Sequence, residues 1–500
     1  MDGMRLFLSI MVPTVIVTWY FQRFGFADSP DSGWYLLVAD SFSQGHFERN
    51  PRYAPLYSYC LGALKFLGLN FHQAITVYMG LIFAAFLWFG NQIIKNIPIL
   101  ILFFLSVLFN ATTYQAFHMI WTETGYSLFM FIATVGLLRM EKGNANYSYL
   151  VILGACALPV QRYIGGYLSF YLGLLYIFFD LKLSQIVRRG VWMVVAAIPA
   201  ATLILMNYMN TETVAGNGRE PATYGILENT VMLLGIFRHY FAYEMILYAL
   251  ALMYTVSLVV RKKVTFRYLL IFLIPLVQMI AQIHSSSTYR FDDINPRFVI
   301  PIIPTVYLLI LLSISNALNL ENFRRISEPR LKQSAYLFLT LILAVGSLLA
   351  KETHFKSVYS KGNQQRFLKI KNEISEVPFN STIAFYINPV RRTSPWVQLP
   401  RIIPDHFCQR YEQIKPITDH HLTYIPTCKL TGGPQFVAVG NPKDKIMKHF
   451  DYFLFVTYDK NLNGQLERES WLSSLKDYEM ISDMGNTFFM KKKTAAVLAL

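Results

Sequence analysis

The residues with the clearest chemical potential are two carboxylates, Asp28 and Asp31, which directly follow the first hydrophobic segment. A membrane loop that only connects two spans needs neither acids nor a cluster of aromatic rings. A carboxylate that is partly desolvated at the rim of a bilayer can take a proton from a hydroxyl group, or can orient that hydroxyl. Four aromatic side chains near these acids would then shape a cleft, namely Trp34, Tyr35, Tyr53 and Tyr57.

Two arginines offer the complementary chemistry, because the planar guanidinium fork matches the oxygen atoms of a phosphate. Arg297 lies where a polar loop, Asp292-Asp293-Ile-Asn-Pro-Arg297, runs into an apolar segment. Arg162 follows Gln161 in the middle of a long apolar run. The alternative for each is an arginine that snorkels to the membrane surface. Phosphate binding is favoured for Arg297, and both interpretations stay open for Arg162.

Three further acids are weaker candidates. Glu123, in Trp121-Thr-Glu123, opens an apolar segment and can line the same cleft. A carboxylate at that position also interacts favourably with the helix N-terminus, for ~0.3 to 1 kcal/mol, and this is the simpler interpretation. Asp292 and Asp293 offer oxygen ligands to a divalent cation, although adjacent acids in a polar loop are more often solvated. The four cysteines have no metal-like spacing and predict no zinc site.

Two amphipathic helices are expected to hold the first loop along the membrane surface. After Asp31, apolar residues recur at three- and four-residue steps, as on one face of a helix. Gly45 is placed to cap the C-terminus of that helix, and Pro55 suits the first turn of the second helix. For both Asp31 and Asp28 the alternative role is that of a helix N-cap.

The composition is that of an integral membrane protein. Of the 500 residues, 54% are hydrophobic, and the mean hydropathy of +0.35 is too high for a soluble domain of this length. The net charge of +15 could indicate a nucleic-acid partner, but Lys and Arg cluster between hydrophobic segments. Loops that face an anionic cytoplasmic leaflet have this pattern. We therefore expect no nucleic-acid partner.

Eleven spans are predicted on the criterion of about 20 apolar residues. Because a mid-bilayer arginine costs at least ~2.5 kcal/mol, Pro159 and Arg162 should lie at a water interface between two short spans. The basic clusters then fall on one side, the cytoplasmic side, while the first loop, Glu123, Arg162 and the loops at 209–240 and 284–297 fall on the other. The spans are 4–21, 72–94, 97–113, 120–139, 147–161, 163–180, 190–208, 241–260, 267–283, 298–316 and 334–350.

From about Lys351 the composition changes to that of a small soluble α/β domain. Outside the cytoplasm, Cys408 and Cys428 could form a disulfide. The predicted organisation is a transmembrane domain at 1–350, with surface helices at about 31–69, and an extracytoplasmic domain at 351–500. Strands are expected at 382–387, 435–439, 452–457 and 487–490, and helices around 364–376 and 467–476.

The first loop resembles that of the GT-C-fold glycosyltransferases, polytopic enzymes that take a sugar from a polyprenyl-phosphate carrier. Protein O-mannosyltransferases and the lipid A aminoarabinose transferase belong to this family. In the family the loop Asp lies in the catalytic site, often followed directly by a second acid; this chain has Ser32 there, so its extra carboxylate would be Asp28. The pattern matches at Asp31, Tyr35, Ala39, Gly45, Pro55 and Tyr57.

Later motifs resemble the family as well. Arg297, followed by Phe298 and three residues later by Pro301, is similar to the family's arginine at the start of a late span, where the basic group faces the carrier phosphate. Arg162, in Gln161-Arg162-Tyr163, is similar to a Thr-Arg-Tyr stretch of several such enzymes. The Thr-Glu pair at Glu123 stands where these enzymes have Ser-Glu.

The resemblance implies a polytopic α-helical membrane protein of GT-C-like fold. The lack of an organellar signal and the compact loops favour a bacterial inner membrane, and the basic residues then put the active site on the periplasmic side. The resemblance also implies an inverting transfer of a sugar from a polyprenyl-phosphate-linked donor to an acceptor that stays open, as does a divalent metal. The alternatives are a lipid or glycan transporter, a non-catalytic envelope protein, and a glycan polymerase or ligase. A transporter places ionisable groups near mid-membrane between internal repeats, and this sequence has no repeat.

Overall fold

The computed structural model describes most of the helical part of the chain and most of the predicted strands. Its residues divide into two units, Met1–Phe24, Ser41–Leu69 and Gln73–Phe355 in the first, and Gly25–Asp40, Asn70–His72 and Lys356–Leu500 in the second. The described residues are 30–47, 53–94, 121–212, 222–288, 294, 296–318, 376–378, 381–388, 411–413, 426–429, 435–438, 450–457, 462–483 and 487–493, with positions 10, 11, 14, 15, 18 and 373. Outside them lie Asp28, Asp292, Asp293, Cys408, the predicted spans 97–113 and 334–350, and most of 4–21 and 364–376.

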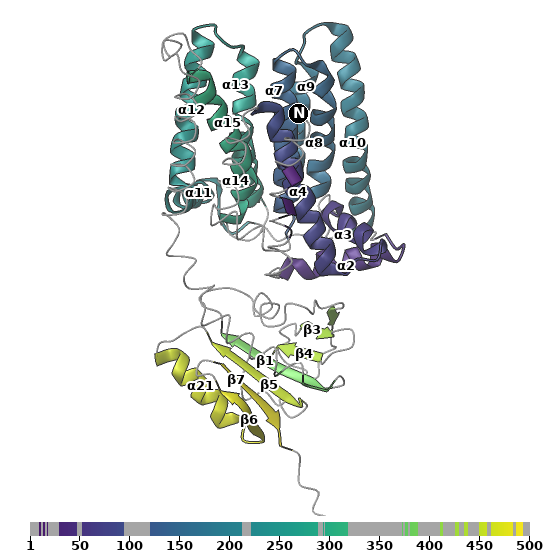
Figure 1. The fold of residues 1–500 in the computed structure, drawn as a ribbon, viewed down its shortest axis with the longest axis vertical. Helices are drawn as coiled ribbons and strands as arrows, with labels where there is room; N and C mark the ends of the chain where they lie inside the picture. The colour runs from purple at the N-terminus through teal and green to yellow at the C-terminus, as the bar shows by residue number, and fades with distance from the viewer. Residues whose placement is uncertain are drawn as a thin grey trace, which may run out of the picture. The chain divides into compact units, whose positions relative to one another are not determined.

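The first unit is a bundle of apolar helices (Figure 1). Each of its long helices lies where the sequence predicts a span. Among the residues that the structure describes, four stretches are long and apolar enough to cross a membrane: Gln73–Ile93, Leu183–Asn210, Ala242–Val260 and Pro296–Ile314. The helices are α4 (Phe71–Ile93), α7 (Glu123–Glu141), α8 (Ser148–Gln161), α9 (Gly165–Ile177), α10 (Leu183–Thr211), α12 (Ala242–Val260) and α15 (Ile303–Leu318).

The outer surface of α10 has the character of a lipid-facing helix. Only 17% of its most apolar window is buried, and large apolar side chains such as Val194 and Met209 are 69% and 76% exposed. In contrast, α7 is buried along almost its whole length. An extended exposed apolar face marks a surface that contacts a membrane or another protein. Together with the apolar length of the helices, it indicates that this unit is embedded in a bilayer.

The two predicted helices of the first loop are present. They are α2 (Pro30–Ser43) and α3 (Leu56–Phe66). Gly45, with φ of +82°, ends α2 as predicted: its N–H donates to the Phe42 carbonyl, while the N–H of His46 donates to the Ser41 carbonyl. This is the Schellman arrangement, which favours glycine at the left-handed position. Pro55 directly precedes α3.

The predicted break around Arg162 is also present. The helix α8 ends at Gln161, Arg162 is extended, and α9 begins at Gly165. The corner is so tight that a Cβ on Gly165 would overlap the main-chain carbonyl of Leu158, whereas a Cβ on Gly166 would meet nothing within 4 Å. Gly165 therefore fixes the backbone geometry of the corner between α8 and α9, where Arg162 lies.

Two predictions for this unit need correction. The loop expected at 209–240 contains a helix, α11 (Ile226–Tyr240), which buries Leu233 and Ile236 and exposes Leu227. The amphipathic pattern was hidden because this helix is too short and too polar for a span. The span expected at 267–283 is two helices, α13 (Phe266–Phe272) and α14 (Ile274–Thr288), bent by 47°. Pro275 explains the break, since proline cannot donate the helical hydrogen bond.

The second unit contains a seven-stranded sheet of order β2-β3-β4-β1-β5-β7-β6. β1 pairs in parallel with β4 and β5, and the other neighbours pair antiparallel. All four predicted strands are present, and three short or exposed strands were missed. The strands are β1 (Thr382–Asn388), β2 (Tyr411–Gln413), β3 (Pro426–Lys429), β4 (Gln435–Ala438), β5 (Tyr452–Thr457), β6 (Tyr478–Asp483) and β7 (Thr487–Lys492).

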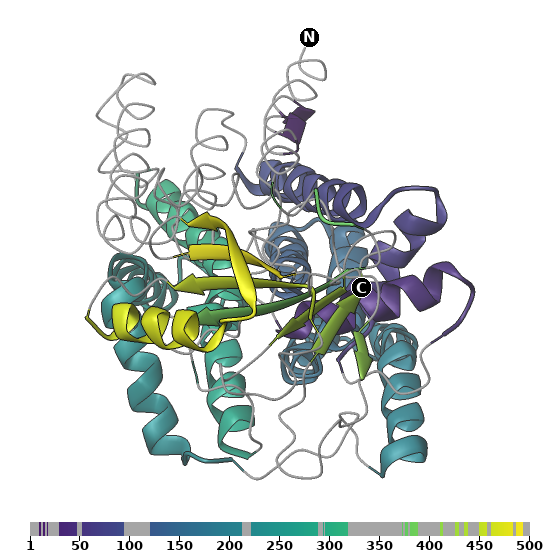
Figure 2. The same ribbon diagram turned by 90° about the horizontal axis from the view of Figure 1, so that it is seen from below.

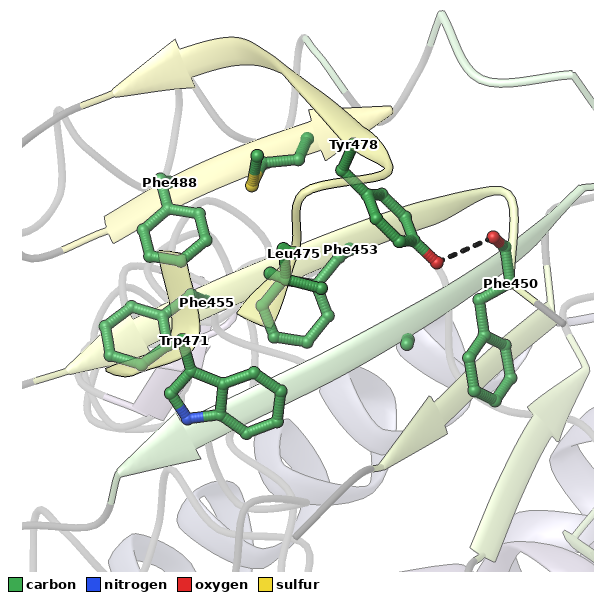
Figure 3. Packing of buried hydrophobic residues seen from close by; sticks show 9 residues of the cluster. Phe450, Phe453, Phe455, Trp471, Leu475, Tyr478 and Phe488 are labelled. Carbon is green, nitrogen blue, oxygen red and sulfur yellow. Dashed lines mark hydrogen bonds between the residues drawn. The ribbon is translucent and has the colours of Figure 1, made fainter. Parts of the chain in front are cut away.

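Figure 2 shows α21 (Leu462–Ser474) beside the sheet, and an aromatic core joins the two (Figure 3). Trp471 is 1% exposed and packs on Phe453, with ring centroids 4.8 Å apart. The hydroxyl of Tyr478 donates to the Phe450 carbonyl at 2.8 Å (Figure 3). Burial, assisted by the charge of Asp451 and Asp477, raises the pKa of Tyr478 to about 12.

Candidate active site

The structure brings together three of the predicted site residues, Glu123, Arg162 and Arg297. Nη1 of Arg162 donates to Oε1 of Glu123 at 2.8 Å, and Nε of Arg297 donates to the same oxygen. Glu123 is fully buried, whereas the side chains of Arg162 and Arg297 are 18% and 12% exposed. One buried carboxylate therefore holds two arginines that are 135 positions apart in the chain. We call these three residues the arginine pair site.

Each member of the site lies at the end of an element. Glu123 is the first residue of α7, Arg162 occupies the break between α8 and α9, and Arg297 lies in a 3-10 turn, η2 (Pro296–Phe298), that leads into α15. Helix ends carry main-chain groups that helical bonding leaves unpaired, so charged side chains gather there at little cost. The site thus forms where three apolar elements end together.

Aromatic rings cover both guanidinium groups. Cζ of Arg297 lies 4.5 Å from the centre of the Trp121 ring, and Cζ of Arg162 lies 5.7 Å from the centre of the Phe298 ring. Both distances are within the range of a cation–π interaction. The rings restrict the arginines to defined planes and exclude water from one side, which preserves the direction of the remaining N–H groups.

Polar contacts to α7 fix the elements around the site. Ser127 donates from its hydroxyl to the Pro301 carbonyl at 2.9 Å, which docks the start of the α15 region on α7. The Tyr126 hydroxyl donates to Gln278 on α14 at 2.6 Å. Nε2 of Gln161 donates to the Thr122 carbonyl at 2.9 Å. These buried bonds join α7, α8, α14 and η3 (Ile300–Ile302) into one rigid frame.

A line of contacts leads from the arginine pair site to the first loop. Gln161, next to Arg162, hydrogen-bonds the side chain of Tyr78 on α4, and the Tyr78 ring packs edge-on against Tyr57 of α3 at 5.1 Å. Tyr57 is 1% exposed, so in this structure it supports the site rather than facing solvent. The helix α3, which carries Tyr57 of the first-loop motif, is therefore packed onto the frame that positions Arg162.

The charge of the site favours an anion. The site offers two guanidinium groups, and each arginine donates one N–H to Glu123. The other guanidinium N–H groups of Arg162 make no hydrogen bond to the described residues. An oxyanion at this partly desolvated position would receive charge-assisted hydrogen bonds, which are about twice as strong as neutral ones. Phosphate is the anion whose geometry the guanidinium fork matches best.

The remaining predicted site residues that the structure describes belong to α2 and to the segment before α3. Asp31 is the second residue of α2, within its first turn, and Trp34 lies one turn further on in the same helix. Tyr35 is buried at 3% exposure, while Tyr53 is half-buried just before α3. Within the described residues, no group of three or more His, Cys, Asp or Glu side chains is arranged to hold a metal ion.

Sequence reasoning underrated Glu123 and missed its supporting residues. The interaction with the helix N-terminus remains valid, but the two arginines are the larger influence on this buried acid. Tyr126, Ser127 and Gln278 carried a usable signal, because polar side chains inside apolar segments usually bond to another helix. Which partner each one has depends on helix packing, and the sequence alone does not fix that packing.

Comparison with known proteins finds no match in sequence but several in fold. No family model matches the chain, and no curated protein matches it. The chain is similar to ArnT from Cupriavidus metallidurans in the apo state, at 11% identity, a TM-score of 0.49 and coverage of 98% of both chains. It is also similar to that ArnT bound to undecaprenyl phosphate, at 11% identity, a TM-score of 0.46 and coverage of 97% of this chain and 98% of that one.

A third solved structure is the arabinofuranosyltransferase AftD from Mycobacteria. The identity is 10%, the TM-score is 0.41, and the match covers 99% of this chain and 40% of that one. These neighbours are glycosyltransferases of GT-C fold, the class that the first loop resembles. Because every TM-score lies below 0.5, none of these likenesses assigns a role to a residue of this chain.

Proposed function

We propose that this chain is an integral membrane glycosyltransferase that moves a sugar from a polyprenyl-phosphate-linked donor to an acceptor on the extracytoplasmic face. The observation that carries the proposal is the convergence of Arg162 and Arg297 on the buried Glu123. Two guanidinium groups gathered where apolar helices end are suited to a phosphate attached to a lipid chain. A soluble anion would not require a site in this position.

In the proposed reaction, the acceptor hydroxyl oxygen attacks the anomeric carbon of the donor sugar. The bond between that carbon and the phosphate oxygen breaks, and the electron pair stays on the lipid phosphate. Arg162 and Arg297 stabilise the charge that develops there, in surroundings where such stabilisation is worth more than in water. A carboxylate takes the acceptor proton, and the single displacement inverts the anomeric configuration.

Asp31 is the residue we propose for this carboxylate, with Asp28 as the second acid. Support comes from the first-loop motif, whose helices and Gly45 cap fold as the motif requires. Trp34, Tyr35 and Tyr53 are proposed to line the sugar cleft, with Tyr57 behind them. Whether a divalent cation assists at Asp292 and Asp293 is left to a measurement of activity after chelation.

The orientation in the membrane follows from the distribution of basic residues. The connections at the end of the bundle opposite the arginine pair site carry Arg139, Lys142, Lys182, Arg188 and Arg189, followed by the run Arg261 to Lys263. Short loops rich in Lys and Arg stay in the cytoplasm. This supports an extracytoplasmic position for Glu123, Arg162 and Arg297.

The test is mass profiling of envelope glycans in a strain that lacks the gene, complemented with the wild-type chain, with Asp31→Asn or with Asp40→Asn. Asp40 lies on the same helix and controls for lost charge on α2. We expect one sugar mass to disappear on deletion and to return with wild type and Asp40→Asn only. Full restoration by Asp31→Asn would remove the catalytic assignment, and an unchanged glycan profile would favour a transporter or a structural protein.

Phosphate recognition is tested separately by binding of a polyprenyl phosphate to the purified chain. Arg297→Gln and Arg162→Gln should each weaken binding by about tenfold or more, the loss expected for one charge-assisted contact. Arg238→Gln, which removes an exposed arginine from α11, is the matched control and should have little effect. Equal binding by all three variants would contradict the proposed role of the arginine pair site.

A further inference from the structure

A second group of arginines lies at the other end of the helical bundle. Glu123 and Glu141 are the first and last residues of α7, so they are about 27 Å apart along the helix axis. Around Glu141 the α9–α10 and α12–α13 connections come together at the same end of the unit (Figure 1). We call Glu141, Arg189, Arg267 and the rings of Tyr176 and Phe179 the distal arginine cluster.

Arg189 is the unusual member of this cluster. Its side chain is 8% exposed and stacks on two rings, with Cζ 5.6 Å from the centre of Tyr176 and 5.7 Å from that of Phe179. Its guanidinium makes no hydrogen bond to any described residue, and Nη1 is wholly buried without an acceptor. A buried charged donor that lacks an acceptor is costly, so this group favours an anion brought from outside.

Arg267 approaches the same ring from α13. Its Cζ lies 4.9 Å from the centre of Phe179, one guanidinium nitrogen donates to the Phe179 carbonyl, and Nε lies 3.6 Å from Oε2 of Glu141. The side chain is 44% exposed. Arg189 and Arg267 therefore lie within 6 Å of one ring, with one acid near them, and the cluster keeps a net positive charge.

Exposed apolar side chains surround the cluster on its outer side. They belong to the end of α9, the connection and the start of α10, and each is more than half exposed: Phe178, Leu181, Leu183 and Val187. This is the pattern of a surface that touches acyl chains, and these residues are neighbours in the chain of the basic side chains of the cluster. Basic side chains gathered at the ends of membrane helices bind the headgroups of anionic lipids.

We propose that the distal arginine cluster is a binding site for the phosphate headgroup of an anionic phospholipid, with Arg189 as its main ligand. The phosphate supplies the acceptor that Arg189 lacks in the protein, and Arg267 contributes a second donor from the exposed side. The acyl chains lie against the apolar surface at the start of α10. This site is separate from the arginine pair site and does not depend on a glycosyltransferase activity.

The experiment measures binding of acyl-labelled phosphatidylglycerol to the purified full-length chain in detergent, by fluorescence polarisation. Arg189→Gln should weaken binding by about 10- to 100-fold, as expected for a lost charged hydrogen bond. Arg188→Gln removes the same charge from the neighbouring exposed residue. It should weaken binding by no more than about fivefold, the effect of a surface charge.

Competition distinguishes a lipid from free phosphate. Unlabelled phosphatidylglycerol should displace the probe, whereas phosphatidylcholine and inorganic phosphate at the same concentration should not. Displacement by inorganic phosphate as strong as that by the lipid would overturn the proposal, as would equal losses in Arg188→Gln and Arg189→Gln. If Arg189→Gln does not fold in phosphatidylcholine nanodiscs, Arg267→Gln, at an exposed side chain, takes its place, with a loss of about tenfold expected.

Discussion

Replacement of Glu123 by glutamine should destabilise the helical unit and disable the arginine pair site together. The carboxylate is fully buried and accepts from two guanidinium groups, one of them at 2.8 Å. Glutamine has almost the same shape and keeps one carbonyl acceptor, so packing changes little. What is lost is the negative charge between Arg162 and Arg297.

The size of the effect follows from burial. Removing one partner of a buried ion pair costs about 3 to 5 kcal/mol, because the remaining charge is left uncompensated. The arginines are 18% and 12% exposed, so each can recover some hydration, and a loss near the lower end, about 3 kcal/mol, is expected. For a unit of this size that corresponds to a thermal midpoint lowered by roughly 5 to 10 °C.

The assay is thermal unfolding of the purified chain in detergent, followed by tryptophan fluorescence. The matched control is Glu228→Gln, an exposed acid in the first turn of α11 whose loss should cost less than about 1 kcal/mol. A double-mutant cycle with Arg162→Gln isolates the pair. The loss in the free energy of unfolding of the double variant should be smaller than the sum of the two single losses by about 1 to 3 kcal/mol.

Three results would contradict this reasoning. Equal midpoints for Glu123→Gln and Glu228→Gln would mean that the buried carboxylate does not hold the arginines together. Additive losses in the double-mutant cycle would mean that Glu123 and Arg162 act independently despite their contact. Retained sugar transfer at a temperature where Glu123→Gln is folded would remove the site from the proposed mechanism.

Three further expectations concern other parts of the chain. Gly165→Ala should destabilise the α8–α9 corner by about 1 to 3 kcal/mol, because the new methyl group overlaps the main chain. Gly166→Ala is the control and should not destabilise it, because a Cβ there meets nothing within 4 Å. The thermal midpoints of the two variants are compared. Trp471→Ala should cost the sheet about 3 to 5 kcal/mol and accelerate amide exchange in β5 by at least about 100-fold. The pKa of Tyr478 in the folded state is raised to about 12, so the folded state keeps a proton that the unfolded state loses near pH 10. The contribution of Tyr478 to the free energy of unfolding is therefore complete below pH 10 and is lost between pH 10 and pH 12. Urea midpoints at pH 9 and 11 should therefore differ more for wild type than for Tyr478→Phe.

The elements of this protein could largely be predicted because their signals are local. Apolar length predicted the long helices, alternating or apolar runs predicted four of the strands, and Gly45 marked a helix end by its conformational freedom. The two predictions for the helical unit that were wrong also have local causes. The helix α11 is amphipathic without the length of a span, and Pro275 divides a stretch whose mean hydropathy looks continuous. A window average cannot register either feature.

The candidate site was predictable in its members but not in its assembly. Arg162 was recognised because charge is expensive in an apolar run, and Arg297 because it resembles the family's arginine at the start of a late span. Their common partner was not, because a Glu at a helix start already has a sufficient local explanation, and contacts across 39 and 174 positions depend on packing. The backbone corner at Gly165 and the contact between Ser127 and Pro301 decide that packing. Neither is visible as a pattern in the sequence.

The arginines at the two ends of α7 differ in the acceptors that the protein supplies to them, and this difference bears on their function. At Glu123 the protein supplies a buried carboxylate, so both arginines are oriented before any ligand arrives. At the other end Arg189 is buried against rings with no acceptor among the described residues, so its orientation there depends on what binds. A site that must stabilise charge during a reaction gains from preorganised donors, whose reorientation would otherwise add to the barrier. A site that only holds a lipid needs no such arrangement, and this difference is why we assign chemistry to the first cluster and anchoring to the second.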